Sequence, residues 1–460
     1  MKAQRPPNLK LRSLLGEAGW TGQELAQFVN AEGARCSLDV RYDRTAVAHW
    51  LSGTRPRHQV CELICRAFTE ALGRTVGLQE AGFATVNGPV DQGSASPPVH
   101  ERLRELAEST PMAVRALRRL PYSPLPDLPS SANGPTVEST SGRLDLAHVR
   151  VAEELVTLFS YADEVFGGGR VRPGLTAYLS TDIAAHLSTP ATPSVSRRLR
   201  LAATDLSYLA GFMSFDSSLH GAAQAYFRIA AQLASEVSDR SRYALALRQM
   251  SVQAHYLGNA RQALHFAQGA AREAECLSPE SAAFVLGQEA LALAGSGQRH
   301  QALERLGQAE RLLGQSSGGG GVLGGYHLAA FTYQQAEVLA TAGDLPAACG
   351  ALAYSLRHRP PEERRARMLT TSRLAGFQLT QGHLELACST WEKFLDDYPH
   401  VASARGDAAL RGLRTRLRSY QREPVAQRVL ARAARQAAPS AERRPSVAAQ
   451  VPRTRKPAGS

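Results

Sequence analysis

The chain has 460 residues, and its 53 Lys and Arg outnumber its 41 Asp and Glu, which gives a net charge of +12. This length allows two or three domains and a large apolar core, so folding requires neither disulfides nor a structural metal. No run of about eighteen apolar residues and no secretory leader is found, which excludes a membrane-spanning helix. The six cysteines are scattered and contain no CxxC pair, which is typical of reduced thiols, so we expect a cytoplasmic protein.

The positive charge is concentrated at one end of the chain. Residues 1–83 have a net charge of +3, residues 84–404 of −2 and residues 405–460 of +11. Composition alone therefore does not indicate a basic, nucleic-acid-binding body.

Two segments have a composition typical of linkers and tails. Residues 84–143 contain nine of the 25 prolines, together with Ser and Gly runs, and we interpret them as a linker. The apolar pattern there allows a short helix around His100–Glu108 and a second at Ala113–Leu120. Residues 436–460 are rich in Pro, Ser, Ala and Arg and are expected to be a disordered basic tail.

The rest of the chain has helical rather than strand periodicity, so we predict an all-α fold. Residues 8–20 place Leu11, Leu14, Leu15 and Ala18 on one face of a first helix. Thr21-Gly22-Gln23-Glu24 is a capping box that starts a second helix, whereas residues 31–42 are polar and predicted to form a turn.

A third helix is predicted at residues 44–51, with Asp43 as its N-cap and Gly53 at its end. Val47, Trp50 and Leu51 would face inward. Val60, Leu63, Ile64, Ala67, Phe68 and Leu72 indicate a fourth helix.

Thr21–Ala26 followed by Thr45–Pro56 resembles the helix-turn-helix of the Xre and Cro–repressor class, with a longer connection between the two helices. The resemblance implies that residues 8–83 form a DNA-binding domain. Short helices with an apolar inner seam and polar outer residues can enter the major groove of double-stranded DNA. The residues expected to contact DNA are Gln23, Arg44, Thr45, Ala48, His49, Arg55 and Arg57. The alternative is a small helical domain whose outer residues are only solvated.

Residues 144–435 contain an internal repeat. A glycine is followed five residues later by alanine at four places, starting at Gly258, Gly297, Gly343 and Gly382, and Ala223 marks a fifth copy that lacks the glycine. Each unit consists of an apolar helix, a turn and an Ala-rich helix, and the set resembles tetratricopeptide repeats with long units. The resemblance implies an α-solenoid whose groove binds a protein, peptide or small ligand.

The chain as a whole resembles actinobacterial regulators that join an Xre-like helix-turn-helix to tetratricopeptide-like repeats, including streptomycete negative regulators of sporulation and antibiotic production. The resemblance rests on residues 20–21, 43–53 and 72–74, and on Phe166–Gly169, Leu209–Ser217 and His220–Phe227. It implies a homodimeric repressor of development or secondary metabolism. The alternative is a protein-interaction scaffold that regulates through partners without binding DNA.

No pattern of catalytic chemistry is found, so we expect neither an enzyme nor a cofactor. Gly319–Gly324 matches GxGxxG without the strand that a dinucleotide site needs, and Gly167-Gly168-Gly169 lacks the Lys of a phosphate loop. Both are predicted to be flexible loops. Cys61 and Cys65 lie one helical turn apart but flank an apolar seam, which favours structural thiols over a metal site.

The basic segment Arg411–Arg435 allows two interpretations. Its leucines and arginines at near-helical spacing indicate either a last capping helix with a solvated Arg-rich face or a non-specific contact with nucleic acid. We favour the capping helix.

Overall fold

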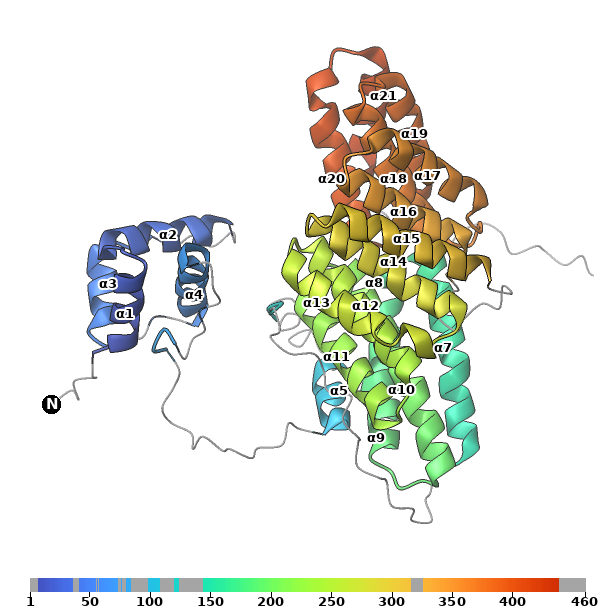
Figure 1. The fold of residues 1–460 in the computed structure, drawn as a ribbon, viewed down its shortest axis with the longest axis horizontal. Helices are drawn as coiled ribbons and strands as arrows, with labels where there is room; N and C mark the ends of the chain where they lie inside the picture. The colour runs from blue at the N-terminus through green and yellow to red at the C-terminus, as the bar shows by residue number, and fades with distance from the viewer. Residues whose placement is uncertain are drawn as a thin grey trace, which may run out of the picture. The chain divides into compact units, whose positions relative to one another are not determined.

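The computed structural model describes residues 7–35, 41–54, 56, 58–72, 76, 80–83, 98–107, 120–123, 144–315 and 326–437. Every regular element in these ranges is helical (Figure 1), which confirms the all-α prediction. The chain divides into two compact units, Met1–Ser96 and Pro97–Ser460. No described helix has the length and apolar character that a membrane crossing requires.

The first unit contains α1 (Leu9–Glu17), α2 (Gly22–Arg35), α3 (Arg44–Leu51) and α4 (His58–Leu72). The capping box forms as predicted, because the Thr21 backbone N–H donates to Glu24 Oε2 at 2.7 Å and the Glu24 N–H donates to Thr21 Oγ1 at 3.3 Å. Leu11, Leu25 and Phe68 are fully buried in the shared core.

The prediction of a turn from residue 31 is wrong, since α2 continues to Arg35. Ala31, Glu32, Ala34 and Arg35 are good helix formers and prolong the helix once it has started. The Asn30 side chain then fixes the returning chain, because its amide donates to the Tyr42 carbonyl and its oxygen accepts from the Tyr42 N–H, both at 2.8 Å.

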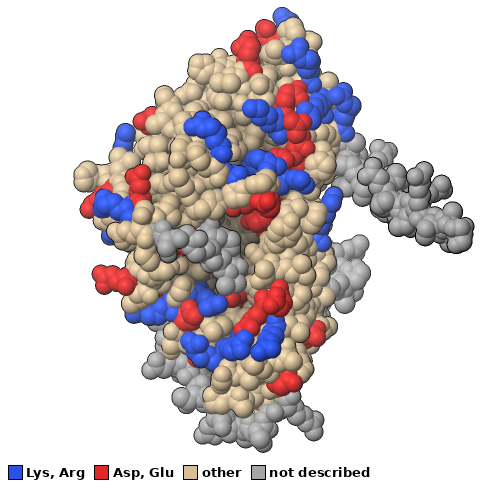
Figure 2. Space-filling view, turned by 90° about the vertical axis from the view of Figure 1, so that its right-hand side faces the viewer, with Lys and Arg blue, Asp and Glu red and all other residues tan. Residues whose placement is uncertain are grey.

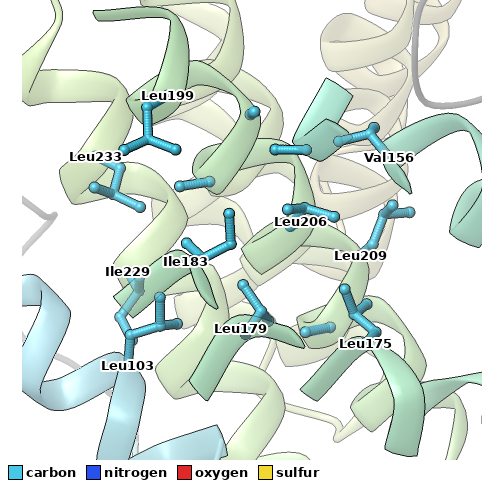
Figure 3. Packing of buried hydrophobic residues seen from close by; sticks show 14 of the residues in the cluster. Leu103, Val156, Leu175, Leu179, Ile183, Leu199, Leu206, Leu209, Ile229 and Leu233 are labelled. Carbon is cyan, nitrogen blue, oxygen red and sulfur yellow. The ribbon is translucent and has the colours of Figure 1, made fainter. Parts of the chain in front are cut away.

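The second unit begins with one long helix, α7 (Leu146–Phe166), and four short elements. The short elements are α5 (Val99–Ala107), α8 (Gly168–Tyr178), the π-helical turn η1 (Leu179–Ile183) and α9 (Ala184–Leu187). Leucine and isoleucine side chains from α5, α8 and η1 meet those of the long helices that follow in one apolar cluster (Figure 3).

Five helical hairpins follow in chain order (Figure 1). They are α10 (Pro193–Asp216) with α11 (His220–Glu236), α12 (Arg240–Tyr256) with α13 (Ala260–Ala271), α14 (Pro279–Gly295) with α15 (Arg299–Gly314), α16 (Leu328–Thr341) with α17 (Leu345–His358), and α18 (Arg364–Thr380) with α19 (Leu384–Asp397). A short 3-10 turn, η2 (Ala274–Cys276), follows α13. The predicted repeat, in which each unit is a pair of helices joined by a turn, is therefore confirmed.

The repeat glycine serves backbone conformation. Gly258, Gly297, Gly343 and Gly382 all have φ between 78° and 89°, and a Cβ atom at any of them would meet nothing within 4 Å. Each lies in a turn where the next residue donates back to the first helix, as the Asn259 N–H does to the Ala254 carbonyl at 2.9 Å. The left-handed region favours glycine because it carries no Cβ.

The fifth copy makes the same turn with serine. Ser218 has φ 59° and lies five residues before Ala223, and the Leu219 N–H donates to the Ser214 carbonyl at 2.8 Å. The five repeat alanines, which let the paired helices approach closely, are all buried: Ala223, Ala263, Ala302, Ala348 and Ala387.

Parts of the predicted linker belong to the second unit. Val99 and Leu103 of α5 are buried in the cluster of Figure 3. Further along, the Ser123 N–H donates to Gln224 Oε1 at 3.0 Å, and Gln224 Nε2 donates to the Ser123 carbonyl at 2.5 Å. The short helix expected around His100–Glu108 is confirmed as α5. The interpretation of 98–107 and 120–123 as linker is wrong, because apolar and hydrogen-bonding contacts attach these residues to the second unit. The predicted helix at 113–120 lies outside the described residues except for Leu120.

The basic segment after residue 404 forms two helices instead of one. A 3-10 turn, η3 (Tyr398–His400), leads into α20 (Ala404–Leu417), and η4 (Arg418–Tyr420) separates it from α21 (Pro424–Gln436). The break coincides with Pro424, which starts α21 at a position where proline is tolerated. Leu410, Leu413 and Leu417 are buried, so this segment caps the array. The Gly319–Gly324 loop and, beyond Ala437, the predicted tail lie outside the described residues.

Ser218→Gly is expected to stabilise the protein. A residue other than glycine in the left-handed region costs about 1–2 kcal/mol. The greater conformational freedom of glycine in the unfolded chain cancels about half of this difference. We therefore expect the free energy of unfolding to rise by about 0.5–1 kcal/mol. Ser218 is exposed, so little else is lost. Urea unfolding measures the change, and Gly258→Ser is the matched control with the opposite sign. Equal midpoints for both variants would refute the assignment of the turn.

Candidate DNA-binding face and cavity of the repeat unit

In the first unit, α3 presents one polar face and buries the other. Asp43 caps it by accepting the Ala46 N–H at 2.9 Å. Val47 and Trp50 are buried, whereas the four predicted contact residues of this helix are exposed: Arg44, Thr45, Ala48 and His49. The structure therefore brings these four together on the free side of α3.

Close packing fixes the placement of α3 against α2. A Cβ atom at Gly22 would lie 3.5 Å from Val47 Cγ1. The Tyr42 and Trp50 rings meet edge to face with centroids 5.1 Å apart, and the Asn8 N–H donates to the Leu51 carbonyl at 3.0 Å. The helix is held at both ends by contacts on its inner side, which leaves the outer side unobstructed within this unit.

Gln23 is exposed in the first turn of α2. The Thr21 N–H at this end donates to Glu24, and this bond lowers the pKa of the Glu24 carboxyl. Arg55 and Arg57 lie outside the described residues.

Charge is mixed on the face of the second unit that Figure 2 shows, where Lys and Arg side chains are interspersed with Asp and Glu. Such a surface gives little sequence-independent attraction to phosphate.

Cys61 and Cys65 behave as predicted for structural thiols, since both are buried in the core of the first unit. The described residues contain no group of three or more His, Cys, Asp or Glu that could hold a metal ion.

The second unit contains a cavity of about 690 Å³ that is partly open to solvent. Its walls come mainly from the first helix of each hairpin, with additions from α7 and α20. Aromatic side chains are prominent in the lining: Phe212, Phe215, Tyr256, Phe284, Tyr326, Tyr333 and Trp391. Pockets of this size are typical of small-ligand sites.

Six arginines and two glutamates also line the cavity. Three of the arginines have carboxylate partners: Arg359 pairs with Glu363 at 2.5 Å, Arg365 with Asp163 at 3.1 Å and Arg373 with Glu337 at 2.8 Å. The other three, Arg248, Arg405 and Arg416, have no ion pair with a described carboxylate. The cavity therefore holds excess positive charge.

A closure contact joins the two ends of the array, and we define it as residues 163–169, 213–216, 365 and 402–403. The Ala402 N–H donates to the Phe166 carbonyl at 2.8 Å and the Gly169 N–H donates to the Ala402 carbonyl at 3.0 Å. Ser403 Oγ donates to Asp216 Oδ1 at 2.8 Å.

The prediction of a flexible loop at Gly167-Gly168-Gly169 is wrong. Gly167 ends α7 with φ 82°, and Gly168 is buried at the start of α8. A Cβ atom at Gly167 would lie 2.6 Å from the Ala402 carbonyl oxygen, and one at Gly168 would lie 2.8 Å from Met213 Cα. The glycines are needed because two backbones approach here at a distance that no side chain allows.

A buried ion pair lies beside these glycines. Asp163 and Arg365 are 3% and 5% exposed, and Arg365 also bonds Glu164. Burial raises the pKa of Asp163 to about 7, with the neighbouring Glu164 and Asp216 carboxylates acting in the same direction and Arg365 opposing them. Asp163 Oδ1 has no hydrogen-bond partner among the described residues. This agrees with a high free-energy cost of ionising the carboxyl group in this buried position.

Comparison with known proteins gives a match for the first unit. The family model described as SP15 N-terminal domain matches residues 11–84, a range that runs from α1 past the end of α4. No curated protein matches the chain. The resemblance to actinobacterial regulators stays a prediction.

Among solved structures, the chain is similar to one described as "Crystal Structure of Rap Protein Complexed with Competence and Sporulation Factor". The identity is 12%, the TM-score is 0.40, and the match covers 65% of this chain and 98% of that one. A similarity of this size carries no conclusion about the function of this chain.

The cavity arginines were not among the residues expected from the sequence. Arg248 lies on α12 between buried Leu247 and Gln249, ten residues before the repeat glycine Gly258. The corresponding residue ten before Gly343 is Tyr333, which also lines the cavity. Alignment of the copies on their glycines would therefore have assigned Arg248 to the inner face of the array. It would not have revealed the curvature of the array that forms the cavity.

Gly168→Ala is expected to lower the free energy of unfolding by about 1–3 kcal/mol, because the added methyl group overlaps the Met213 backbone. Gly350→Ala in α17 is the control, since nothing lies within 4 Å of its Cβ position and a helical glycine replaced by alanine gains up to about 1 kcal/mol. Urea unfolding of both variants checks this. A Gly168→Ala protein as stable as Gly350→Ala would contradict the close approach.

Asp163 is expected to make stability depend on pH. Its folded-state pKa lies near 7, above the usual 3.8, so folding favours the protonated form. The stabilisation is complete below about pH 4 and is lost as the pH rises towards 7. Asp163→Asn should remove this loss, so the difference in unfolding free energy between variant and wild type should grow in favour of the variant from pH 4 to pH 7. Parallel stability–pH curves would show that Asp163 does not titrate in this range.

Proposed function

We propose that this protein is a transcriptional regulator that binds double-stranded DNA with its first unit and a ligand with its repeat unit. The observation that carries the proposal is the exposed face of α3, on which Arg44, Thr45, Ala48 and His49 lie together while Val47 and Trp50 anchor the opposite side. A short helix held in this way is suited to the major groove.

Each exposed residue has a chemical role in the proposal. Arg44 would donate two hydrogen bonds to a guanine edge, and Thr45 and His49 would contact bases or phosphates. Ala48 leaves room for close approach to the groove floor. Gln23, together with Arg55 and Arg57, would hold the phosphate backbone on either side.

The finer parts of the proposal rest on the sequence resemblance. It suggests a homodimeric repressor of development or secondary metabolism, and a two-fold dimer would select DNA sites with two related halves. The scattered cysteines, typical of reduced thiols, suggest that it acts in the cytoplasm. A ligand in the cavity would act by favouring one arrangement of the DNA-binding units over another.

One observation favours the alternative, a scaffold that acts through protein partners. α2 ends at Arg35 and α3 begins at Arg44, whereas the turn of a helix-turn-helix has three or four residues. The net charge of +3 for residues 1–83 is also low for a DNA-binding module. The two functions differ in whether the free protein selects particular DNA sequences.

Selection of genomic fragments by the purified full chain tests this difference. Arg44→Ala and Thr45→Ala are each expected to weaken binding to the enriched fragments by about 5–150-fold, the range for loss of one specific base contact. Arg261→Ala, an exposed arginine of α13, is the control and should bind as the wild type does. Failure to enrich any sequence, or equal binding by all four proteins, would favour the scaffold.

A further inference from the structure

We propose that the cavity of the repeat unit binds a small organic anion, a carboxylate or phosphate carried on a planar group, and that Arg248 is its principal anion-binding residue. This inference deepens the proposed function and rests on its assignment of ligand binding to the repeat unit.

Arg248 is partly buried and has no described counter-ion. Its Nη1 donates to Gln249 Oε1 at 2.8 Å, while its Nε is inaccessible to solvent and has no hydrogen-bond partner. Burial lowers the pKa of its guanidinium, and the groups that oppose this effect are the phenols of Tyr208 and Tyr326 rather than a carboxylate. An isolated buried charge is costly, so its presence in a cavity wall indicates that an anion from outside completes the site.

Aromatic rings orient the unpaired guanidinium groups. Arg248 Cζ lies 3.6 Å from the centroid of Phe284, and Arg405 Cζ lies 5.1 Å and 5.6 Å from those of Phe215 and Tyr256. A ring over the face of a guanidinium leaves its edge open to hydrogen bonds in the plane. For Arg248 the donors that remain are those of Nη2 and the second hydrogen of Nη1, because Nη1 already donates to Gln249 and Nε is inaccessible to solvent. These donors have the geometry to bind carboxylate or phosphate oxygens in pairs.

Two glutamines and a tyrosine of the cavity wall are already hydrogen-bonded. Gln334 Nε2 donates to Gln288 Oε1 at 3.3 Å, Gln288 Nε2 donates to Ser251 Oγ at 3.0 Å, and Tyr326 donates to Gln334 Oε1 at 2.6 Å. Since these amides satisfy each other, the donors left for a ligand belong mainly to arginine. The site therefore favours a ligand rich in acceptors and negative charge.

Three other arginines of the cavity differ from Arg248 because each forms an ion pair with a carboxylate. Arg359, Arg365 and Arg373 each have a carboxylate within 3.1 Å. Only the charges of Arg248, Arg405 and Arg416 are then not balanced by a described carboxylate among the arginines of the cavity. The aromatic lining adds apolar area for the planar part of the ligand, and a volume of about 690 Å³ accommodates a small molecule or the end of a short peptide.

Calorimetric titration of the full chain, without DNA and at constant ionic strength, tests the proposal with three probes. Phenyl phosphate carries a phosphate on a ring, N-benzoylglycine a carboxylate next to an amide as at a peptide end, and N-benzoylglycinamide is its neutral counterpart. We expect at least one of the anions to bind and the neutral amide not to bind. Binding by phenyl phosphate alone would identify phosphate as the preferred group, and binding by N-benzoylglycine would show that a carboxylate suffices.

Arg248→Gln should weaken binding of the anion by about tenfold or more, the effect expected when a charge-assisted bond is lost. Arg405→Gln is a second variant in case the first does not fold, and it should weaken binding in the same direction. Arg261→Gln, outside the cavity, should bind as the wild type does.

Three results would overturn the inference: no binding of either anion up to about 10 mM, equal binding of the neutral amide, or anion affinities unchanged in the folded cavity variants. None of them bears on DNA selection by α3, which is measured separately, so failure of the anion site and failure of the DNA-binding proposal are distinguishable.

Discussion

The repeat unit depends on a contact between two stretches of backbone. Gly167, Gly168 and Gly169 let α7 and α8 approach Ala402 so closely that main-chain N–H and C=O groups bond directly across the contact. Through it, the end of the last hairpin meets the helices that precede the first hairpin. The cavity is bounded on one side by this contact, because Glu164 and Arg365 belong both to it and to the cavity wall. A looser join would remove this wall and leave the cavity more open to solvent.

Local chemistry made much of the architecture predictable. Thr21 and Glu24 mark the start of α2, Asp43 marks that of α3, and the glycine–alanine spacing located four of the five hairpin turns. These signals act within one or two helical turns, so they can be recognised without knowing the fold. The helix α5 shows the limit, since Val99 and Leu103 lie in a Pro- and Ser-rich region and become core residues only because η1 and α11 present an apolar surface to them.

The same distinction applies to the candidate sites. The polar face of α3 follows from the helical period, so Arg44, Thr45, Ala48 and His49 could be grouped in advance. The cavity could not, because its arginines come from helices more than a hundred residues apart, and only the curvature of the array shows which of them lack a carboxylate. The prediction of a flexible loop at Gly167–Gly169 was wrong for a similar reason. In the sequence, three glycines indicate conformational freedom, and their role in a close approach is recognised only when the opposite backbone is known.

The range of sequence separations in the repeat unit has a consequence for the order of folding. Each hairpin joins helices adjacent in the chain through a tight turn, so its contacts form at low cost in loop entropy. The closure contact joins residues far apart in the chain, with sequence separations of 201 for Glu164 and Arg365 and 187 for Asp216 and Ser403. We therefore expect the hairpins to form and stack before the closure contact, which would be a late step. Changes at the glycines should accelerate unfolding more than they slow folding, since interactions that form after the transition state act mainly on the unfolding rate.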